Sequence, residues 1–100
     1  MRKITEESID AFLNHRRFKR ANTEVVVGDG YTDLCLHNNI IAKLTNNCLY
    51  VSTAGWNTNT TRDRLNGIPG VHVRCRNGRL TLNGEIFLSG ALIEVTGWKK

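Results

Sequence analysis

The apolar positions near the N-terminus repeat at helical spacing. Ile9, Phe12 and Leu13 fall on one face of a helix. Thr5 is a suitable N-cap, because its hydroxyl accepts a hydrogen bond from a free backbone N–H of the first turn. We expect the helix to run to about Arg17, with acidic side chains near its positive end and basic side chains near its negative end.

After Ala21 and Asn22 the apolar period changes to two. Four short runs rich in β-forming residues follow, and turn-forming residues separate them. This pattern predicts an antiparallel meander with strands at residues 23–27, 31–36, 40–44 and 48–52.

Residues 53–71 then predict a short helix between strands. Thr60 is the expected N-cap, and Asp63 would bond back toward it in the manner of a capping box. Gly67 suits the left-handed position after a helix, and Pro69 prevents the helix from resuming.

Asn77-Gly78 is the strongest hairpin signal, because a type I′ turn requires positive φ at both central residues. A two-residue turn fixes the register, so Arg76 should face Arg79 and Arg74 should face Thr81. One side of the ribbon is then an expected core set: Val71, Val73, Cys75, Leu80 and Leu82. The other side carries His72, Arg74, Arg76, Arg79, Thr81 and Asn83.

A further turn at Asn83-Gly84 and an apolar run at residues 92–95 complete the pattern. The sequence therefore predicts an α+β fold, with an N-terminal helix packed on an antiparallel β-sheet (meander plus hairpin) and a second short helix between strands. A chain of 100 residues indicates a single domain, 1–100.

The net charge of +5 is concentrated in two blocks, at residues 15–20 and 62–79. The second block contains the charged side of the hairpin. Directly opposed arginines repel each other, and such local conflicts mark some binding faces. The functional hypothesis is a face for phosphates or carboxylates, made of His72, Arg74, Arg76 and Arg79 with Arg62 and Trp56 nearby. The alternative, which base rates favour, is a solvated face that discourages edge-to-edge pairing.

Two further assignments keep alternatives. Trp56 is expected in the core against the short helix, and the alternative is an exposed anchor in a partner interface. The first basic block resembles a nucleic-acid patch, but compensation of the helix dipole explains most of it. That secondary basic patch consists of Arg16, Arg17, Lys19 and Arg20.

Catalytic and metal motifs are not found. Cys35, Cys48 and Cys75 lie far apart and predict free, buried thiols rather than a zinc site. The histidines form no paired motif, and no phosphate loop or nucleophile elbow is present. We therefore expect a protein that is not an enzyme and needs no cofactor or metal. The apolar runs are too short for a transmembrane span or a secretory signal, so a cytosolic protein is expected.

Several segments together resemble a group of small proteins encoded by tailed bacteriophages. They include Ala54-Gly55-Trp56, then Thr60-Thr61, Leu65-Asn66 and Pro69-Gly70-Val71, and finally Leu82-Asn83-Gly84. The resemblance spans nearly the whole chain and implies a phage product in the host bacterial cytoplasm. It brings no catalytic residues with it.

These observations favour a phage-encoded, non-enzymatic accessory protein that binds and modulates a host macromolecule, as a host-takeover or anti-defence inhibitor. The expected partner is a host protein with an acidic surface. The alternative is a nucleic-acid-binding protein that places its basic patches on phosphates.

Overall fold

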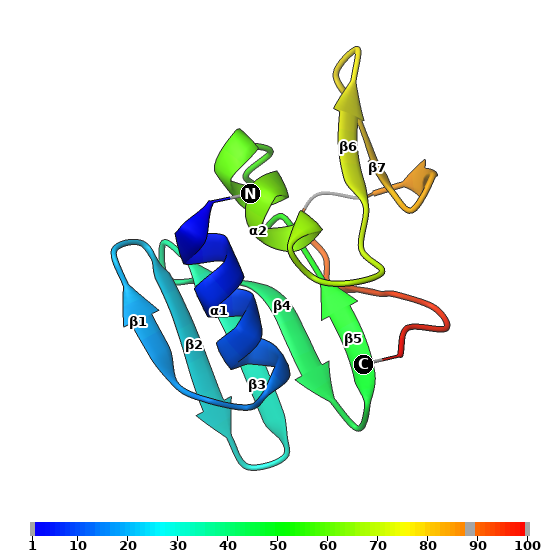
Figure 1. Ribbon diagram of the computed structural model, residues 1–100. Helices are drawn as coiled ribbons and strands as arrows, with labels where there is room; N and C mark the ends of the chain where they lie inside the picture. The colour runs from blue at the N-terminus through cyan, green and yellow to red at the C-terminus, as the bar shows by residue number, and fades with distance from the viewer. Residues whose placement is uncertain (1, 88–89, 100) are drawn as a thin grey trace.

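The computed structural model describes residues 2–87 and 90–99 of the chain (Figure 1). The N-terminal half carries one helix followed by five strands: α1 (Lys3–Leu13), β1 (Phe18–Arg20), β2 (Thr23–Gly28), β3 (Tyr31–Leu36), β4 (Asn39–Thr45) and β5 (Cys48–Val51). The second half carries a short helix and four strands: α2 (Asn59–Asn66), β6 (Val73–Arg76), β7 (Arg79–Leu82), β8 (Glu85–Ile86) and β9 (Ile93–Glu94). The predicted α+β class is confirmed.

The larger sheet has the order β1-β2-β3-β4-β5-β9, and every neighbouring pair is antiparallel. The predicted meander is its centre, β2 to β5. The last apolar run returns as β9 and pairs with β5, with Val51 opposite Ile93. Helix α1 crosses the face of β1, β2 and β3, as Figure 1 shows. Ile9 and Phe12 of α1 are buried against this sheet face, which confirms the predicted apolar side of the helix.

The predicted ends of α1 are wrong. The helix begins at Lys3 with Arg2 as an N-cap that makes no side-chain bond, and Thr5 is fully buried inside it. It stops at Leu13, and His15 takes a positive φ of 54° as the chain turns. The chain then pairs with β2 as strand β1 instead of continuing as a helix. This pairing also brings Phe18 against the core.

The caps of α2 also differ from the prediction. Thr58, not Thr60, caps the helix, and its Oγ1 accepts a hydrogen bond from the Thr61 N–H at 3.1 Å. Asp63 makes no capping box, because its carboxylate bonds Thr5 and Arg64.

Gly67 is not left-handed, since its φ is −72°. A Cβ at this position would lie 2.6 Å from Thr5 Cγ2 and 3.0 Å from Ile9 Cγ1. Close approach of α1, rather than a turn, therefore requires glycine here. The left-handed residue is Gly70, with a φ of 83°.

Strands β6, β7 and β8 form a small separate sheet, and the β6–β7 hairpin projects from the body of the molecule (Figure 1). The predicted register is confirmed, with Arg76 opposite Arg79 and Arg74 opposite Thr81. Its apolar side is buried at the base, where Val73 is 2% exposed. The prediction of a core position is wrong for Cys75, which is exposed because the hairpin tip extends beyond the core.

Candidate functional site

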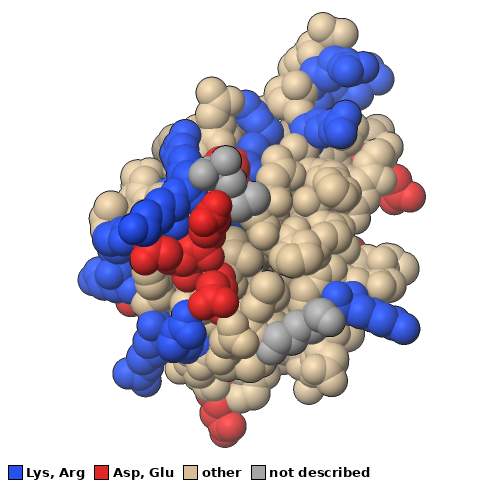
Figure 2. Space-filling model, in the orientation of Figure 1, with Lys and Arg blue, Asp and Glu red and all other residues tan. Residues whose placement is uncertain are grey.

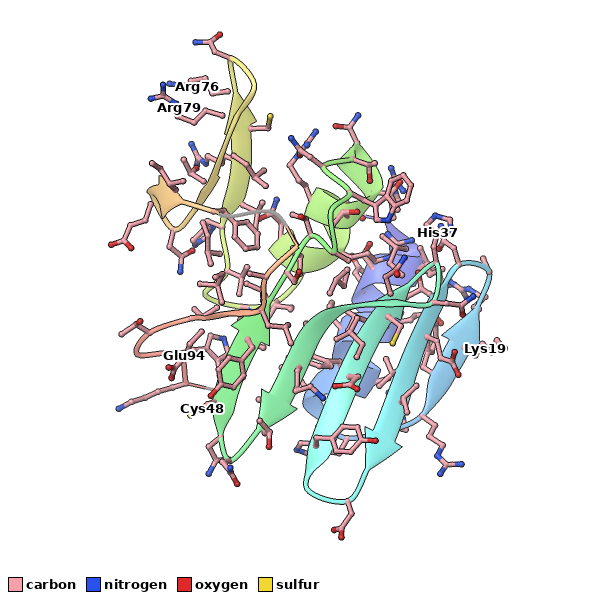
Figure 3. The ribbon with its side chains drawn as sticks, turned by 180° about the vertical axis from the view of Figure 1, so that it is seen from behind. Lys19, His37, Cys48, Arg76, Arg79 and Glu94 are labelled. Atoms are coloured by element: carbon pink, nitrogen blue, oxygen red, sulfur yellow. The ribbon has the colours of Figure 1, made fainter. Side chains whose placement is uncertain are left out.

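The hairpin places the side chains of Arg74, Arg76 and Arg79 on one side of the ribbon, and we call this set the arginine face. A two-residue turn with positive φ at Asn77 and Gly78 fixes the strands in this register. Figure 3 shows Arg76 and Arg79 pointing to the same side of the hairpin, away from α2. The three side chains line a shallow hollow of about 420 Å³ together with Thr81.

The described part of the chain does not neutralise the arginine face. Within residues 2–87 and 90–99, none of its guanidinium groups forms an ion pair with a carboxylate. His72 lies at the base of the same ribbon side, where its backbone N–H donates to Asn83 Oδ1 at 2.8 Å. The result is a cluster of exposed positive charge on a ribbon of fixed register, with guanidinium N–H donors for an anionic group.

The secondary basic patch is divided. Arg16 Nη2 lies 2.5 Å from Asp10 Oδ2, and Arg20 Nη2 lies 2.6 Å from Glu7 Oε1. In Figure 2 the acidic side chains gather over α1 and basic side chains border them. The explanation of this patch by helix-dipole compensation is wrong, because its residues follow the helix rather than form its last turn. Two of its charges instead form exposed ion pairs with Asp10 and Glu7 of α1.

Trp56 was expected to pack in the core, and this prediction is wrong. Its side chain is 61% exposed. It lines a groove of about 520 Å³ with His37, Asn39, Leu36 and Ile41, which we call the Trp56 groove. The arginine face lines a different hollow, so the structure does not bring Trp56 and these arginines into one site.

Arg62 connects the Trp56 groove and the β6–β7 hairpin only indirectly. Its guanidinium donates to the side chains of Asn57 and Asn59 at the start of α2. The Asn57 amide in turn donates to Cys75 Sγ on the inner side of the hairpin, at 3.4 Å. Arg62 therefore fixes the loop after Trp56, rather than joining the arginine face.

One buried cation, Arg64, was not predicted from the sequence. It is 2% exposed and donates to Thr5 Oγ1 at 2.6 Å, to Thr23 Oγ1 at 3.1 Å and to Asp63 Oδ2 at 3.0 Å. Burial lowers the pKa of Arg64, and the neighbouring Asp63 opposes this shift.

A signal for this burial exists in the sequence. The buried residues of this segment follow helical spacing, namely Thr61, Arg64, Leu65 and Ile68. The position of Arg64 in that stripe, rather than its charge, predicts that its side chain is buried.

The cysteines are free, as predicted, but they are not buried in the core. Cys35 and Cys48 are half-buried and Cys75 is exposed. Burial raises the pKa of the Cys35 thiol, and the carboxylates of Asp33 and Glu24 raise it further.

No three His, Cys, Asp or Glu side chains of the described part of the chain gather into a metal-binding group. None of the described helices has the length and apolar character needed to cross a membrane.

Comparison with protein families gives a match over the full sequence. A family model described as Kyanoviridae Gp96 protein matches residues 1–100. Neither the curated proteins nor the solved structures give a match. The resemblance to phage proteins is thus confirmed at the level of a phage family, while the Ala54-Gly55-Trp56 segment as its signature stays a prediction.

Proposed function

The chain belongs to the Kyanoviridae Gp96 family of phage proteins, and from this premise we propose that it is a non-enzymatic accessory protein that binds a host macromolecule through its arginine face. The partner we propose is a host protein with an acidic surface, met in the bacterial cytoplasm. Binding there would disable a defence or redirect host machinery, so the phage protein would act as an inhibitor.

The observation that supports this proposal is the unneutralised arginine face. Arg76 and Arg79 are opposed in register, and like charges at such positions destabilise a hairpin by about 0.2–1 kcal/mol. Other cations of the chain, such as Arg16 and Arg20, are paired with its own carboxylates. A complementary anionic surface would relieve the repulsion and accept charge-assisted hydrogen bonds.

The fixed register of the hairpin supports a protein partner as well. The turn fixes the register, and Val73 and Leu82 anchor the base of the ribbon in the core. The backbone that carries the three arginines therefore keeps one register before binding, so that mainly the side chains lose freedom in forming an interface.

Phosphates are the second candidate ligand of this face. Guanidinium groups bind phosphate oxygens as well as carboxylates, so the alternative is a nucleic-acid-binding protein. Binding that rests on phosphates falls steeply as salt rises, because counterions are released from the nucleic acid. A gel shift with duplex and single-stranded DNA tests this alternative, and no binding at about 50 mM salt rejects it.

Affinity capture from host lysate tests the protein-binding proposal. The tagged chain should retain a stoichiometric host protein under mild salt, and nuclease treatment should leave the captured protein in place. Failure to retain any protein partner under these conditions counts against the proposal. Loss of the partner on nuclease treatment favours the nucleic-acid alternative.

A further inference from the structure

The small sheet has a third strand, which adds one apolar residue to the side that carries the arginine face. Strand β8 lies beside β7 and is drawn in orange in Figure 1. Ile86 of β8 is in register with Thr81, and Thr81 is in register with Arg74. Directly opposed residues of antiparallel strands lie on the same side of a sheet. Ile86 therefore lies in one row with Arg74, on the side of the arginine face.

The backbone of β8 holds Ile86 on this outer side. Asn83 and Gly84 form a two-residue turn with φ values of 50° and 87°, and this turn sets the pairing of β7 with β8. The Phe87 N–H donates to the Leu80 carbonyl at 3.0 Å, and Phe87 is 4% exposed. Because successive side chains of a strand alternate, the burial of Phe87 directs Ile86 outward.

Ile86 breaks the usual pattern of an antiparallel sheet with one solvated side. Such a sheet carries apolar residues inward and polar residues outward, as Arg74 and Thr81 do here. Ile86 instead is 74% exposed, more than any other large apolar side chain that the structure describes. One exposed isoleucine alone needs no explanation. Its position is informative, because it adjoins arginines that form no ion pair within the described part of the chain.

The carboxylate of β8 lies on the other side of the small sheet. Glu85 is in register with Leu82, which faces the core. Strand alternation therefore directs Glu85 away from the arginine face. The outer side is thus cationic toward the hairpin tip and apolar at Ile86. Its complement is a surface that offers both carboxylates and an apolar side chain.

We propose that the arginine face and Ile86 together bind an acidic protein segment that carries an apolar side chain. The carboxylates of the segment meet Arg74, Arg76 and Arg79, and its apolar side chain covers Ile86. This inference rests on the proposed function of the arginine face, and it adds which chemistry the partner needs besides negative charge.

The apolar part of this side favours a protein segment over a nucleic acid. Phosphates supply negative charge but no apolar group to cover Ile86. Bases of a single strand are bound by stacking on aromatic rings, and the described residues of this side include no Phe, Tyr or Trp. Removing an isoleucine side chain from water contributes to affinity where the partner also buries apolar surface.

The dimensions of the small sheet set the spacing of the partner's groups. Neighbouring strands lie about 4.8 Å apart, so the backbone of Ile86 is about 10 Å from that of Arg74, two strands away. An extended peptide spans about 10 Å in three residues. A segment with glutamates followed three residues later by a leucine therefore matches both ends of this row.

Fluorescence anisotropy with two labelled peptides tests the proposal. The first peptide has four glutamates, two alanines and a leucine, and the second has a serine in place of the leucine. At about 50 mM salt the leucine peptide should bind the unchanged protein about 5- to 10-fold more tightly, as expected from partial burial of one leucine side chain on Ile86. This ratio should persist at about 150 mM salt, because salt screens charges but not apolar contacts.

Three variants separate the contributions. Ile86→Ser should remove the difference between the two peptides, because the leucine loses the side chain that it contacts. Ile40→Ser is the matched control, since Ile40 is also exposed but lies in β4 of the larger sheet, and here the difference should remain. Arg74→Ser/Arg76→Ser/Arg79→Ser should weaken the binding of both peptides by at least about tenfold.

Equal affinity of the unchanged protein for both peptides, or a difference that persists in Ile86→Ser, would refute the contact with Ile86. Loss of both peptides in the triple arginine variant would then still uphold the arginine face. Unchanged binding by the triple arginine variant, or no binding of either peptide by the unchanged protein, would overturn this inference and the proposed function together. A labelled DNA duplex that binds more tightly than the leucine peptide, and equally well to Ile86→Ser, would make the face a phosphate site.

Discussion

At the scale of single residues, the buried Arg64 links the two helices. Its guanidinium bonds Thr5 of α1, Thr23 of β2 and Asp63 of its own helix. A buried cation is tolerated because its hydrogen bonds and a nearby carboxylate replace water. Three separate segments thus converge on one side chain, which is why its charge does not contribute to a binding surface.

Replacement of Arg64 by Met should destabilise the protein strongly. The change leaves Asp63, Thr5 and Thr23 without their shared donor, and breaking a buried pair from one side lowers the free energy of unfolding by about 3 kcal/mol. Urea denaturation followed by circular dichroism measures this change in the free energy of unfolding. Arg62→Met is the control on the same helix, because Arg62 bonds only side-chain amides and should change stability by less than about 1 kcal/mol. Equal losses in both variants would contradict this role for Arg64.

The thiols should differ in reactivity. Cys75 is exposed, whereas Cys35 is half-buried and has a raised pKa, so less of it is thiolate at mildly alkaline pH. Iodoacetamide labelling followed by peptide mass spectrometry should modify Cys75 several-fold faster than Cys35. The denatured chain, in which both thiols are open, provides the reference rates. Cys35 reacting first in the folded protein would refute the burial described here.

At the scale of elements, the contact between α1 and α2 depends on the missing side chain at Gly67. Thr5 Cγ2 and Ile9 Cγ1 of α1 occupy the space that a Cβ would fill. Replacing a glycine of right-handed φ by Ala normally raises the free energy of unfolding by about 0.4–1 kcal/mol, because the unfolded chain loses conformational freedom. The close approach of the two helices reverses that sign.

Gly67→Ala should therefore destabilise the protein by about 1–3 kcal/mol, as other overpacked sites do. Thr5→Ser removes the methyl group nearest to the new Cβ, so the double variant Gly67→Ala/Thr5→Ser should recover part of the loss. Thermal unfolding of the four proteins in this cycle measures the coupling. A stabilised Gly67→Ala protein would refute the close approach.

Elements specified by local chemistry were predictable from the sequence. The turn at Asn77-Gly78 fixes the hairpin register within two residues, so the pairing of Arg76 with Arg79 followed without tertiary information. The helix ends were not predictable in this way. Thr5 has the chemistry of a cap, but the tertiary contact with Arg64 draws it into the helix interior.

The candidate site was predictable to the same extent. The arginine face depends only on strand alternation, so its geometry could be read from the sequence. The exposure of Trp56 could not, because it depends on where the chain returns after β5 and on the turn at Ala54 and Gly55. The prediction that Cys75 is buried was wrong for a related reason. Strand alternation gives the side of the ribbon on which a residue lies, but not how far the core extends beneath that side.

At the scale of the whole molecule, the charge is partly compensated in a defined pattern. The chain carries a net charge of +5, and Asp10 and Glu7 of α1 pair with Arg16 and Arg20 of the first basic block. Figure 2 shows a separate group of basic side chains over the β6–β7 hairpin. A directed positive field remains there, which steers association with an acidic surface.

The most direct test of the account compares capture of the host partner by two variants of equal charge. Arg74→Ser/Arg76→Ser/Arg79→Ser removes the arginine face, whereas Lys3→Ser/Arg17→Ser/Lys99→Ser removes the same charge from exposed positions elsewhere. Both should fold like the unchanged protein by circular dichroism. The account predicts that the first variant loses the partner and the second retains it; equal retention by both would contradict it.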